Sequence, residues 1–150
     1  MTDANGGEAQ CQYSALCYRI VDGAPQVLLV TTRGSGRWIV PKGWPMPGRT
    51  PAETAAREAW EEAGVIGTVT DRCLGLFGYD KVIDGRSVAC VARVFPVQVL
   101  MLADAFPEKG QRRRRWFSPA EAAGRVAEPE LAAILRSVGA VLPSLAAAAG

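Results

Sequence analysis

The sequence contains no histidine among its 150 residues. This absence excludes serine–histidine and cysteine–histidine catalysis, zinc sites that use imidazole, and proton transfer by histidine. Catalysis by this chain must therefore rest on carboxylates, lysine, arginine, cysteine or a metal ion. No two of the four cysteines form a C-x-x-C pair, so the ligand spacing typical of zinc is missing too. Three of them lie in apolar runs and are predicted to fill the core: Cys17, Cys73 and Cys90.

The sequence also lacks a large excess of either charge. Seventeen Lys and Arg residues stand against fifteen Asp and Glu residues, for a formal net charge of +2. This excess is too small to indicate a nucleic-acid or membrane partner by charge alone. No apolar run is long enough to cross a bilayer, and residues 1–10 lack the basic and apolar regions of a signal peptide. We therefore expect a cytoplasmic protein with reduced cysteines, and neither a membrane nor a nucleic acid as partner.

The length suits a single domain. Hydrophobic residues make up 49% of the chain and charged residues 21%, which is typical of a globular domain and argues against overall disorder. We expect a flexible segment over residues 1–11, one domain over residues 12–142 and a low-complexity tail over residues 143–150. The alanine-rich end of that tail is expected to fray. The oligomeric state is left open between a monomer and a homodimer.

Runs of β-branched and aromatic residues predict the strands. The first two predicted strands are joined by a turn at Asp22-Gly23, which is typical of a hairpin. The third is short and ends at Pro41, and Pro96 is expected to interrupt the fifth. The predicted strands cover residues 13–20, 26–32, 37–40, 66–79, 87–100 and 113–117.

Two capping boxes predict helix starts. Both Thr50-Pro51-Ala52-Glu53 and Ser118-Pro119-Ala120-Glu121 have a hydroxyl residue at the N-cap, Pro at N1 and Glu at N3. The first helix should cover residues 51–63 and end at Gly64. The second should begin at Pro119 and break near Pro129, with a further helix over residues 131–138. Strands mixed with a few helices predict an α/β or α+β sandwich.

The first predicted helix carries a group of carboxylates. Glu58 and Glu62 are one turn apart on the same stripe, and Glu61 lies beside them. Carboxylates that converge in this way are typical ligands of a hard divalent cation such as Mg²⁺ or Mn²⁺. The alternative is a solvated acidic face on which Arg57 pairs with Glu53 or Glu61.

The surroundings of this helix favour the metal site. The segment 43–65 resembles the Nudix box of the Nudix hydrolases, G-x5-E-x7-R-E-U-x-E-E-x-G-U. The first Glu of that pattern is replaced by Arg49. Segments outside the box resemble the diphosphoinositol polyphosphate phosphohydrolase group, among them residues 37–41 and the basic run 110–117. The matching positions of the box are Gly43, Arg57, Glu58, Glu61, Glu62, Gly64 and Val65.

The resemblance implies a fold, a reaction and a set of site residues. The fold would be a Nudix-type α/β/α sandwich with a mixed β-sheet and a loop–helix–loop Nudix box. The reaction would be hydrolysis of a diphosphate linkage, with Mg²⁺ or Mn²⁺ as cofactor and a small phosphorylated molecule as substrate. The implied metal ligands are Glu58, Glu62, Glu61 and the backbone carbonyl of Lys42. Glu61 would also be the catalytic proton acceptor and Arg57 would orient a carboxylate, while Gly43 and Gly64 would be structural.

Phosphates of the substrate need cations or hydrogen-bond donors. Thr31, Arg33 and Arg112 match substrate-contacting positions of the group, and further candidates are Arg37, Lys81 and Arg86. An exposed-loop role is the alternative for Arg33 and Arg37. In a strand over residues 112–115, alternate arginines would point to opposite faces, so only half of them could reach one pocket. Trp38 and Trp116 are expected as core or rim aromatics rather than base-stacking platforms.

The departures from the group bear on the substrate. Basic residues of the group correspond here to Gln10, Gln12 and Glu128, so a highly phosphorylated inositol would lack those cations. Dinucleoside polyphosphates carry fewer charges and would fit better. Two alternatives stay open. One is a binding or sensor domain without turnover, which the replacement of the first Nudix-box Glu by Arg49 favours. The other is hydrolysis at the 5′ end of RNA.

Overall fold

The computed structural model describes residues 10–149 of the chain. These residues form one eight-stranded mixed sheet and a set of helices that pack on it. The strands are β1 (Gln10–Val21), β2 (Ala24–Thr31), β3 (Trp38–Ile39), β4 (Lys42–Gly43), β5 (Val65–Val69), β6 (Gly75–Ile83), β7 (Arg86–Leu102) and β8 (Arg114–Phe117). The helices are α1 (Pro51–Ala63), α2 (Pro119–Arg125), α3 (Pro129–Ser137), the 3₁₀ helix η1 (Val138–Ala140) and α4 (Leu142–Ala149).

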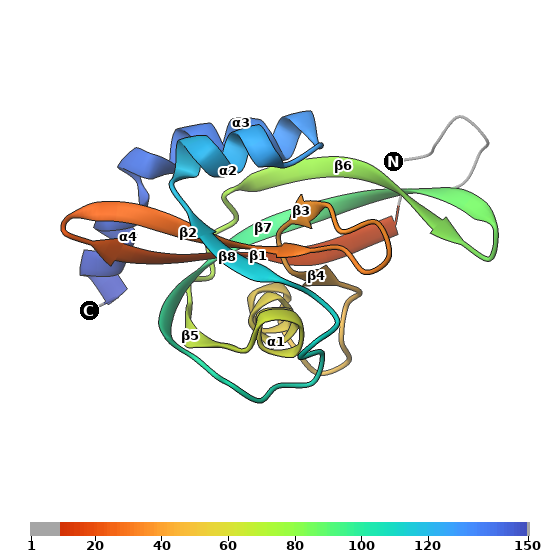
Figure 1. Cartoon of the computed structure of the whole chain (residues 1–150), viewed down its shortest axis with the longest axis horizontal. Coiled ribbons are helices and arrows are strands. Elements are labelled where there is room, and N and C mark those ends of the chain that lie inside the picture. The colour runs from red at the N-terminus through yellow and green to blue at the C-terminus, as the bar shows by residue number, and fades with distance from the viewer. Residues whose placement is uncertain (1–9, 150) are drawn as a thin grey trace.

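Strand β1 lies at the centre of the sheet. It pairs in parallel with β7 and antiparallel with β2 and β4. The main path of the sheet runs β3-β2-β1-β7-β5, while β6 pairs with β7 and β8 pairs with β2. Helix α1 lies on one side of the sheet, and α2 and α3 lie on the other (Figure 1). This arrangement is the predicted α/β/α sandwich with a mixed sheet.

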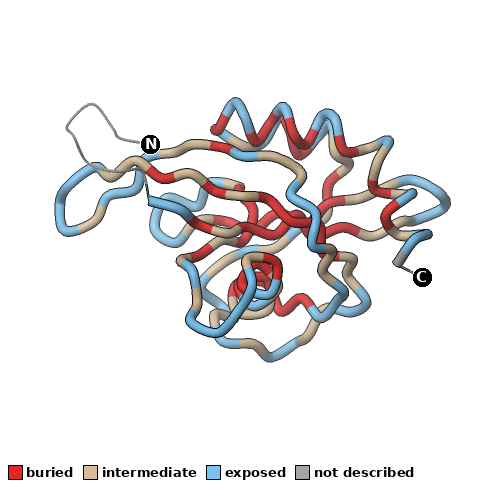
Figure 2. The backbone as a smooth tube through the Cα atoms, turned by 180° about the vertical axis from the view of Figure 1, so that it is seen from behind, coloured by how far each residue is buried: buried red, intermediate tan, exposed pale blue. Residues whose placement is uncertain are grey.

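The core follows from the apolar runs of the inner strands. In β1 every residue from Ala15 to Tyr18 is buried, and in β2 every residue from Val27 to Thr31 is buried, because layers cover both faces of these strands. Figure 2 shows the buried residues along the central strands and on the inner sides of the helices. Cys17 and Cys90 lie in this core as predicted, whereas Cys73 is exposed in the connection between β5 and β6.

The strand predictions need two corrections. The predicted strand over residues 66–79 is two strands, because residues 70–74 carry the chain from β5 to β6. Strand β7 continues through Pro96, which was expected to interrupt it. Strand β6 pairs with β7 up to Val94 and β5 pairs with it from Val97 onward. Pro96 therefore stands between the two antiparallel partners, where its missing N–H costs little.

The helix starts agree with the prediction. Thr50 and Ser118 both accept from the backbone of the third helical residue, and both capping boxes are complete. Helix α1 ends at Gly64 in the left-handed conformation. Helix α3 begins at Pro129 rather than at residue 131.

Both ends of the chain differ from the predicted boundaries. Residues 143–149, most of the predicted low-complexity tail, belong to helix α4, because Leu142 and Leu145 are buried against the rest of the fold. Of the predicted flexible segment, residues 1–9 lie outside the described residues, and Gln10 and Cys11 belong to β1. No single helix in the described part is long and apolar enough to cross a membrane. Residues 129–140 and 142–148 together are long and apolar enough, but a bend of 59° separates them.

Candidate active site

Helix α1 is held close to the sheet by small residues. Ala52, Ala55, Ala59 and Ala63 are buried, and their short side chains let the helix backbone approach β1 and β5. On the adjoining stripe Glu58 and Glu62 are also buried, with 9% and 5% of their surfaces exposed. Two acidic side chains are thus carried into the interior by the packing of the helix that bears them.

The two buried carboxyl groups form a pair. They lie one turn apart on the same stripe of α1, and each carboxyl group affects the pKa of the other. Burial raises the pKa of Glu62 to about 8, and it raises the pKa of Glu58 as well. A bound cation would compensate the cost of burying two neighbouring carboxyl groups.

The backbone of β4 lies directly against this pair. A Cβ atom on Gly43 would come within 2.2 Å of Cδ and Oε1 of Glu58, so only glycine leaves room for the carboxyl group. Strand β4 is fixed there by antiparallel pairing of Gly43 with Tyr13 and of Lys42 with Ser14. The carbonyl of Lys42 belongs to the peptide bond that joins it to Gly43, so the predicted carbonyl ligand lies in the segment that touches Glu58.

Arg112 connects the carboxyl pair to the loop between β7 and β8. Its Nη1 lies 3.8 Å from Oε1 of Glu62, and its Nε donates to Oε1 of Glu108 at 2.9 Å. Its Nη1 also donates to the backbone carbonyl of Thr31. Glu108, which the sequence analysis did not include, therefore belongs to the site. Only its neighbour four residues on, Arg112, could have pointed to it.

Thr31 has a different position from the one predicted. Its side chain is buried, and its Oγ1 accepts from the backbone N–H of Arg113 at 2.9 Å. The backbone carbonyl of Thr31 also accepts from Arg112. These two hydrogen bonds orient the segment that contains Arg112 and Arg113. Thr31 does not line the cavity described below.

Glu61 forms an ion pair with Arg57. Its Oε1 lies 3.2 Å from Nε of Arg57, and this ion pair is partly exposed. In residues 10–149 no three Cys, Asp or Glu side chains are arranged as a metal site. The structure therefore brings Glu58 and Glu62 together but not Glu61, and the predicted convergence of three carboxylates is not seen. The alternative pairing of Arg57 with Glu61 is present.

A cavity of about 450 Å³ opens beside Lys42 and Arg112. Four of the predicted substrate residues line it: Arg33, Arg37, Lys81 and Arg112. Arg86 is not among the lining residues, because it lies at the turn of the β6–β7 hairpin, opposite Ile83. The complete lining is Thr32, Arg33, Ser35, Arg37, Ile39, Lys42, Tyr79, Asp80, Lys81, Val82 and Arg112.

The side chain of Lys42 is a further cation of the cavity. Its Nζ lies 4.9 Å from the centre of the Tyr79 ring. Burial lowers the pKa of Lys42, while the charge of Glu62 acts in the opposite direction. Tyr79 in turn donates its hydroxyl to the buried Gln12. The sequence predicts only the backbone carbonyl of Lys42 as a site group, since no local pattern shows where its side chain points.

The basic run alternates as predicted. Arg112 and Arg114 turn inward, whereas Arg113 and Arg115 are exposed and lie over the rings of Trp38 and Phe117. Trp38 and Trp116 are half-buried, as expected of rim aromatics, and neither lines the cavity. Two arginines of the run therefore face the interior, and the other two lie over the rings of the half-buried Trp38 and the buried Phe117.

The donor set at α1 suits a hard divalent cation. Two buried carboxyl groups next to the backbone of Lys42 and Gly43 supply the oxygen ligands that Mg²⁺ or Mn²⁺ prefers. The carboxyl pair and the five cations of the cavity meet at Arg112, which touches both. This is the arrangement needed to bind a phosphorylated molecule beside a metal.

Comparison with known proteins agrees with this geometry. The family model of the NUDIX domain matches residues 12–138. The chain belongs to the Nudix family. The segment 43–65 is thus a Nudix box, with Arg49 in place of its first Glu.

Curated Nudix relatives are similar over part of their length. Diphosphoinositol polyphosphate phosphohydrolase 3-alpha of Mus musculus is 33% identical over 106 residues, which cover 69% of this chain and 61% of that protein. The protein named "Nudix hydrolase 12, mitochondrial" of Arabidopsis thaliana is 33% identical over 101 residues, which cover 65% and 50%. The chain thus spans about half to three-fifths of the length of these relatives.

Solved Nudix structures share the fold. The C. elegans Ap4A hydrolase in a binary complex superimposes with a TM-score of 0.67 at 20% identity, covering 91% of this chain and 99% of that one. The NUDIX domain of Shewanella oneidensis NrtR, complexed with ADP ribose, gives 0.60 at 19% identity and covers 88% of each chain. This likeness confirms the Nudix-type sandwich predicted from the sequence.

Proposed function

We propose that this chain hydrolyses a diphosphate linkage in a small phosphorylated molecule, with Mg²⁺ or Mn²⁺ held by Glu58 and Glu62. The observation that carries the proposal is the position of Arg112. This residue contacts the buried carboxyl pair and lines a cavity with four further cations. Metal ligands and phosphate-binding groups are thereby adjacent, as metal-assisted phosphate chemistry requires.

The residues have different roles, which follow from their positions. Arg33, Lys42, Lys81 and Arg112 bind and orient phosphate oxygens in the cavity. When bound, the cation neutralises phosphate charge and makes water more acidic. Glu61 accepts the proton of the attacking water, in keeping with its place in the Nudix box, and Arg57 at 3.2 Å orients its carboxylate.

The names of similar proteins suggest two substrate classes to test. One relative is a diphosphoinositol polyphosphate phosphohydrolase, and one structural neighbour is an Ap4A hydrolase. Both names describe phosphorylated small molecules with diphosphate linkages. A cavity with four or five cations can bind either class, so the family alone does not choose between them.

Phosphorus NMR of the purified protein with Mg²⁺ tests the proposal. The panel contains diphosphoinositol polyphosphates, dinucleoside polyphosphates, ADP-ribose and nucleoside triphosphates. We expect cleavage of at least one class, reduced more than about 100-fold in Glu62→Gln, which removes a metal-binding carboxylate. Asp71→Asn is the matched control, because Asp71 is exposed in the connection between β5 and β6.

Three outcomes are informative. Cleavage that is lost in Glu62→Gln and kept in Asp71→Asn supports the proposal. Full turnover in Glu62→Gln rejects the metal site. Tight binding of a panel member without any cleavage rejects the hydrolase and supports a binding domain, the alternative that Arg49 raises.

A further inference from the structure

Three arginines gather over two aromatic rings at the end of β8. The guanidinium carbon of Arg113 lies 5.1 Å from the centre of the Trp38 ring. Those of Arg115 and Arg125 lie 5.2 Å and 5.4 Å from the centre of the Phe117 ring. The two rings touch edge to face, with 5.2 Å between their centres. The three side chains therefore form one arginine cluster, although two of them belong to the β8 segment and Arg125 belongs to α2.

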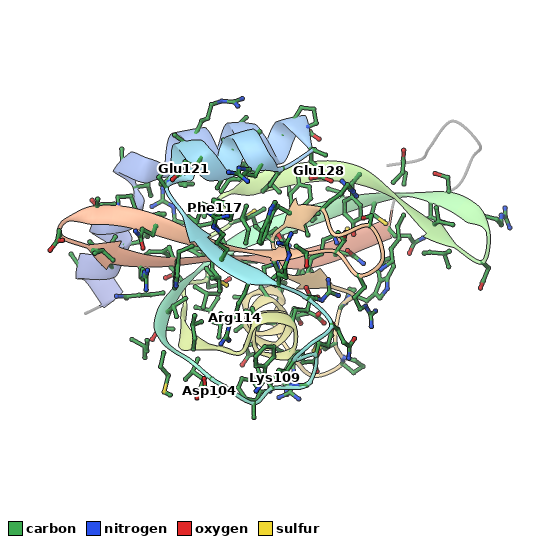
Figure 3. All side chains as sticks on the ribbon, in the orientation of Figure 1. Asp104, Lys109, Arg114, Phe117, Glu121 and Glu128 are labelled. Atoms are coloured by element: carbon green, nitrogen blue, oxygen red, sulfur yellow. The ribbon has the colours of Figure 1, made fainter. Side chains whose placement is uncertain are left out.

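The arginine cluster carries positive charge that no ion pair balances. Among the described residues none of its three members has a carboxylate oxygen within 4 Å, and all three are exposed. Hydrogen bonds with Ser118 lower the pKa of Glu121, and the charges of Arg125 and Arg115 add to this effect. Glu121 is engaged in the cap of α2, however, where its Oε1 accepts from Ser118. Figure 3 labels Phe117 and Glu121, on either side of the junction between β8 and α2.

The cavity does not explain this charge. No member of the arginine cluster is among the residues that line it. The rings beneath the guanidinium groups hold them in place by cation–π contact, so the cluster is ordered without a ligand. An ordered group of exposed, unpaired arginines is a surface that favours an anionic partner.

Strand β8 also leaves one edge without a partner. Among the described strands it pairs with β2 alone, and Figure 1 shows it in front of β1 and β2. The backbone N–H of Thr31 donates to the carbonyl of Arg113 at 3.0 Å, so the odd-numbered residues of this segment turn their backbone groups toward β2. The N–H and C=O groups of Arg114 and Trp116 therefore point away from β2. The described part of the chain offers them no backbone partner.

The free edge and the arginine cluster are matched in spacing. Side chains on one face of a strand recur about every 6.6–6.8 Å, at every second residue. Arg113 and Arg115 have this separation in sequence, and so do alternate residues of any extended peptide. A peptide paired with β8 would therefore place every second side chain next to the cluster. Carboxylates at those positions would form charge-assisted hydrogen bonds with the guanidinium groups.

We infer that the edge of β8 is a docking site for an extended acidic segment of another protein, with Asp or Glu at alternate positions. The segment adds to the sheet as a further strand, in which backbone bonds to Arg114 and Trp116 supply the pairing and the arginine cluster selects the carboxylates. A nucleic acid would match the charge but would leave the free backbone groups of the edge unused. This surface lies outside the cavity, and its role is independent of the proposed hydrolysis.

Fluorescence anisotropy in EDTA at low ionic strength tests the inference. One labelled peptide alternates Glu and Thr over eight residues, and the other has the same composition as four Glu followed by four Thr. We expect the alternating peptide to bind at least about fivefold more tightly, because only it can pair as a strand and present all its carboxylates on one face. Absence of binding would show that the arginines only protect the edge against pairing, and equal binding of the two peptides would show recognition of charge alone. Either result overturns the inference.

Charge-reversal variants locate the bound peptide. Arg115→Glu should weaken the alternating peptide by about tenfold while hydrolysis stays unchanged. Arg125→Glu, on α2, should act in the same direction and covers poor folding of the first variant. Arg86→Glu is the matched control, since Arg86 lies at the turn of the β6–β7 hairpin. If Lys81→Glu, inside the cavity, weakens the peptide as much as Arg115→Glu does, the peptide occupies the cavity and the inference is wrong.

Amide hydrogen exchange tests the strand pairing itself. Binding of the alternating peptide should slow exchange of the N–H groups of Arg114 and Trp116 by at least about tenfold, with no change at Arg86. Binding without this protection would contradict addition of a strand. An oligouridylate of equal charge is the last probe: if it binds more tightly than the peptide and depends on Arg115, the partner is a nucleic acid and the inference fails.

Discussion

The contact between Gly43 and Glu58 ties two parts of the site together. The absent side chain of Gly43 provides the space in which the carboxyl group of Glu58 lies, 2.2 Å from where a Cβ would be. Glu58 lies beside the buried Glu62 on the same stripe of α1. The lack of a side chain at Gly43 therefore allows the carboxyl pair to lie against β4.

We predict that Gly43→Ala damages activity more than stability. The clashing atoms are the end of a flexible side chain, so Glu58 should rotate away while the backbone stays in place. Overpacking of this kind costs about 1–3 kcal/mol in free energy of unfolding. A displaced carboxylate should lower metal-dependent hydrolysis by about 100-fold. The two quantities are measured by urea unfolding and by the NMR assay.

Gly124→Ala is the control for this substitution. Gly124 lies in α2, and an added Cβ would meet no atom within 4 Å. It should be neutral or stabilising, by up to about 1 kcal/mol. Equal loss of activity in both alanine variants would show that contact with Glu58 is not the cause.

Helix α1 is secured at both ends by different devices. At the N-terminus the capping box of Thr50 and Glu53 satisfies free backbone N–H groups. At the C-terminus Gly64 turns the chain, and Nη1 of Arg114 donates to the carbonyls of Ala63 at 2.7 Å and Ala103 at 3.0 Å. The guanidinium group thus joins the end of α1 to the chain that leaves β7; Figure 3 labels Arg114 beside this helix.

We predict that Arg114→Ala destabilises the fold by about 2–3 kcal/mol, because hydrogen bonds from a charged donor to two partly buried carbonyls are lost. Urea unfolding measures this change. Arg115→Ala is the adjacent control: Arg115 is exposed over the Phe117 ring, and its loss should cost less than about 1 kcal/mol. Similar values for the two variants would refute the assignment of Arg114 to the helix end.

At the scale of the whole molecule, α4 closes the fold away from the cavity. It lies at the end of the molecule opposite the β6–β7 hairpin (Figure 1), and it contacts β1 and β2. Leu142 and Leu145 are buried at 0% and 9% exposure. The last helix therefore covers the end of the core rather than the site.

We predict that Leu142→Ala lowers stability by about 2–5 kcal/mol, as expected for truncation of a buried leucine. The kcat of the folded fraction should stay unchanged, because α4 does not line the cavity. Thermal unfolding and the NMR assay measure the two effects. Leu100→Ala, at a residue that is 67% exposed, should change stability by less than about 0.5 kcal/mol. If Leu142→Ala is equally mild, α4 does not contribute to the core.

Features that depend on neighbouring residues were predictable from the sequence. The capping box at Thr50 and the glycine stop at Gly64 predicted α1 over its whole length, because a helix end is decided by three or four adjacent residues. The i,i+4 spacing put Glu58 and Glu62 on one stripe, and the period of two divided the arginines between two faces. The Nudix box and the sandwich followed from the spaced motif around them.

Features that depend on distant residues required the tertiary structure. The cavity joins the turn after β2, strand β6 and the loop before β8, and no local pattern shows that Lys42 faces it or that Arg86 does not. The partners of Arg37 and Arg112, Glu128 and Glu108, are set by packing of separate elements. Likewise Pro96 is accepted within β7 because of where two other strands end.

The sequence by itself therefore determined helix α1, the strands around the centre of the sheet and most of the charged candidates for the site. Only the tertiary structure decided which of these side chains line the same cavity. It also decided that Glu61 pairs with Arg57 and that Arg37 pairs with Glu128. The physical reason is the sequence distance over which each interaction acts. Capping and periodicity act within one or two turns of chain, whereas burial, ion pairing and close packing act between whatever residues the fold brings together.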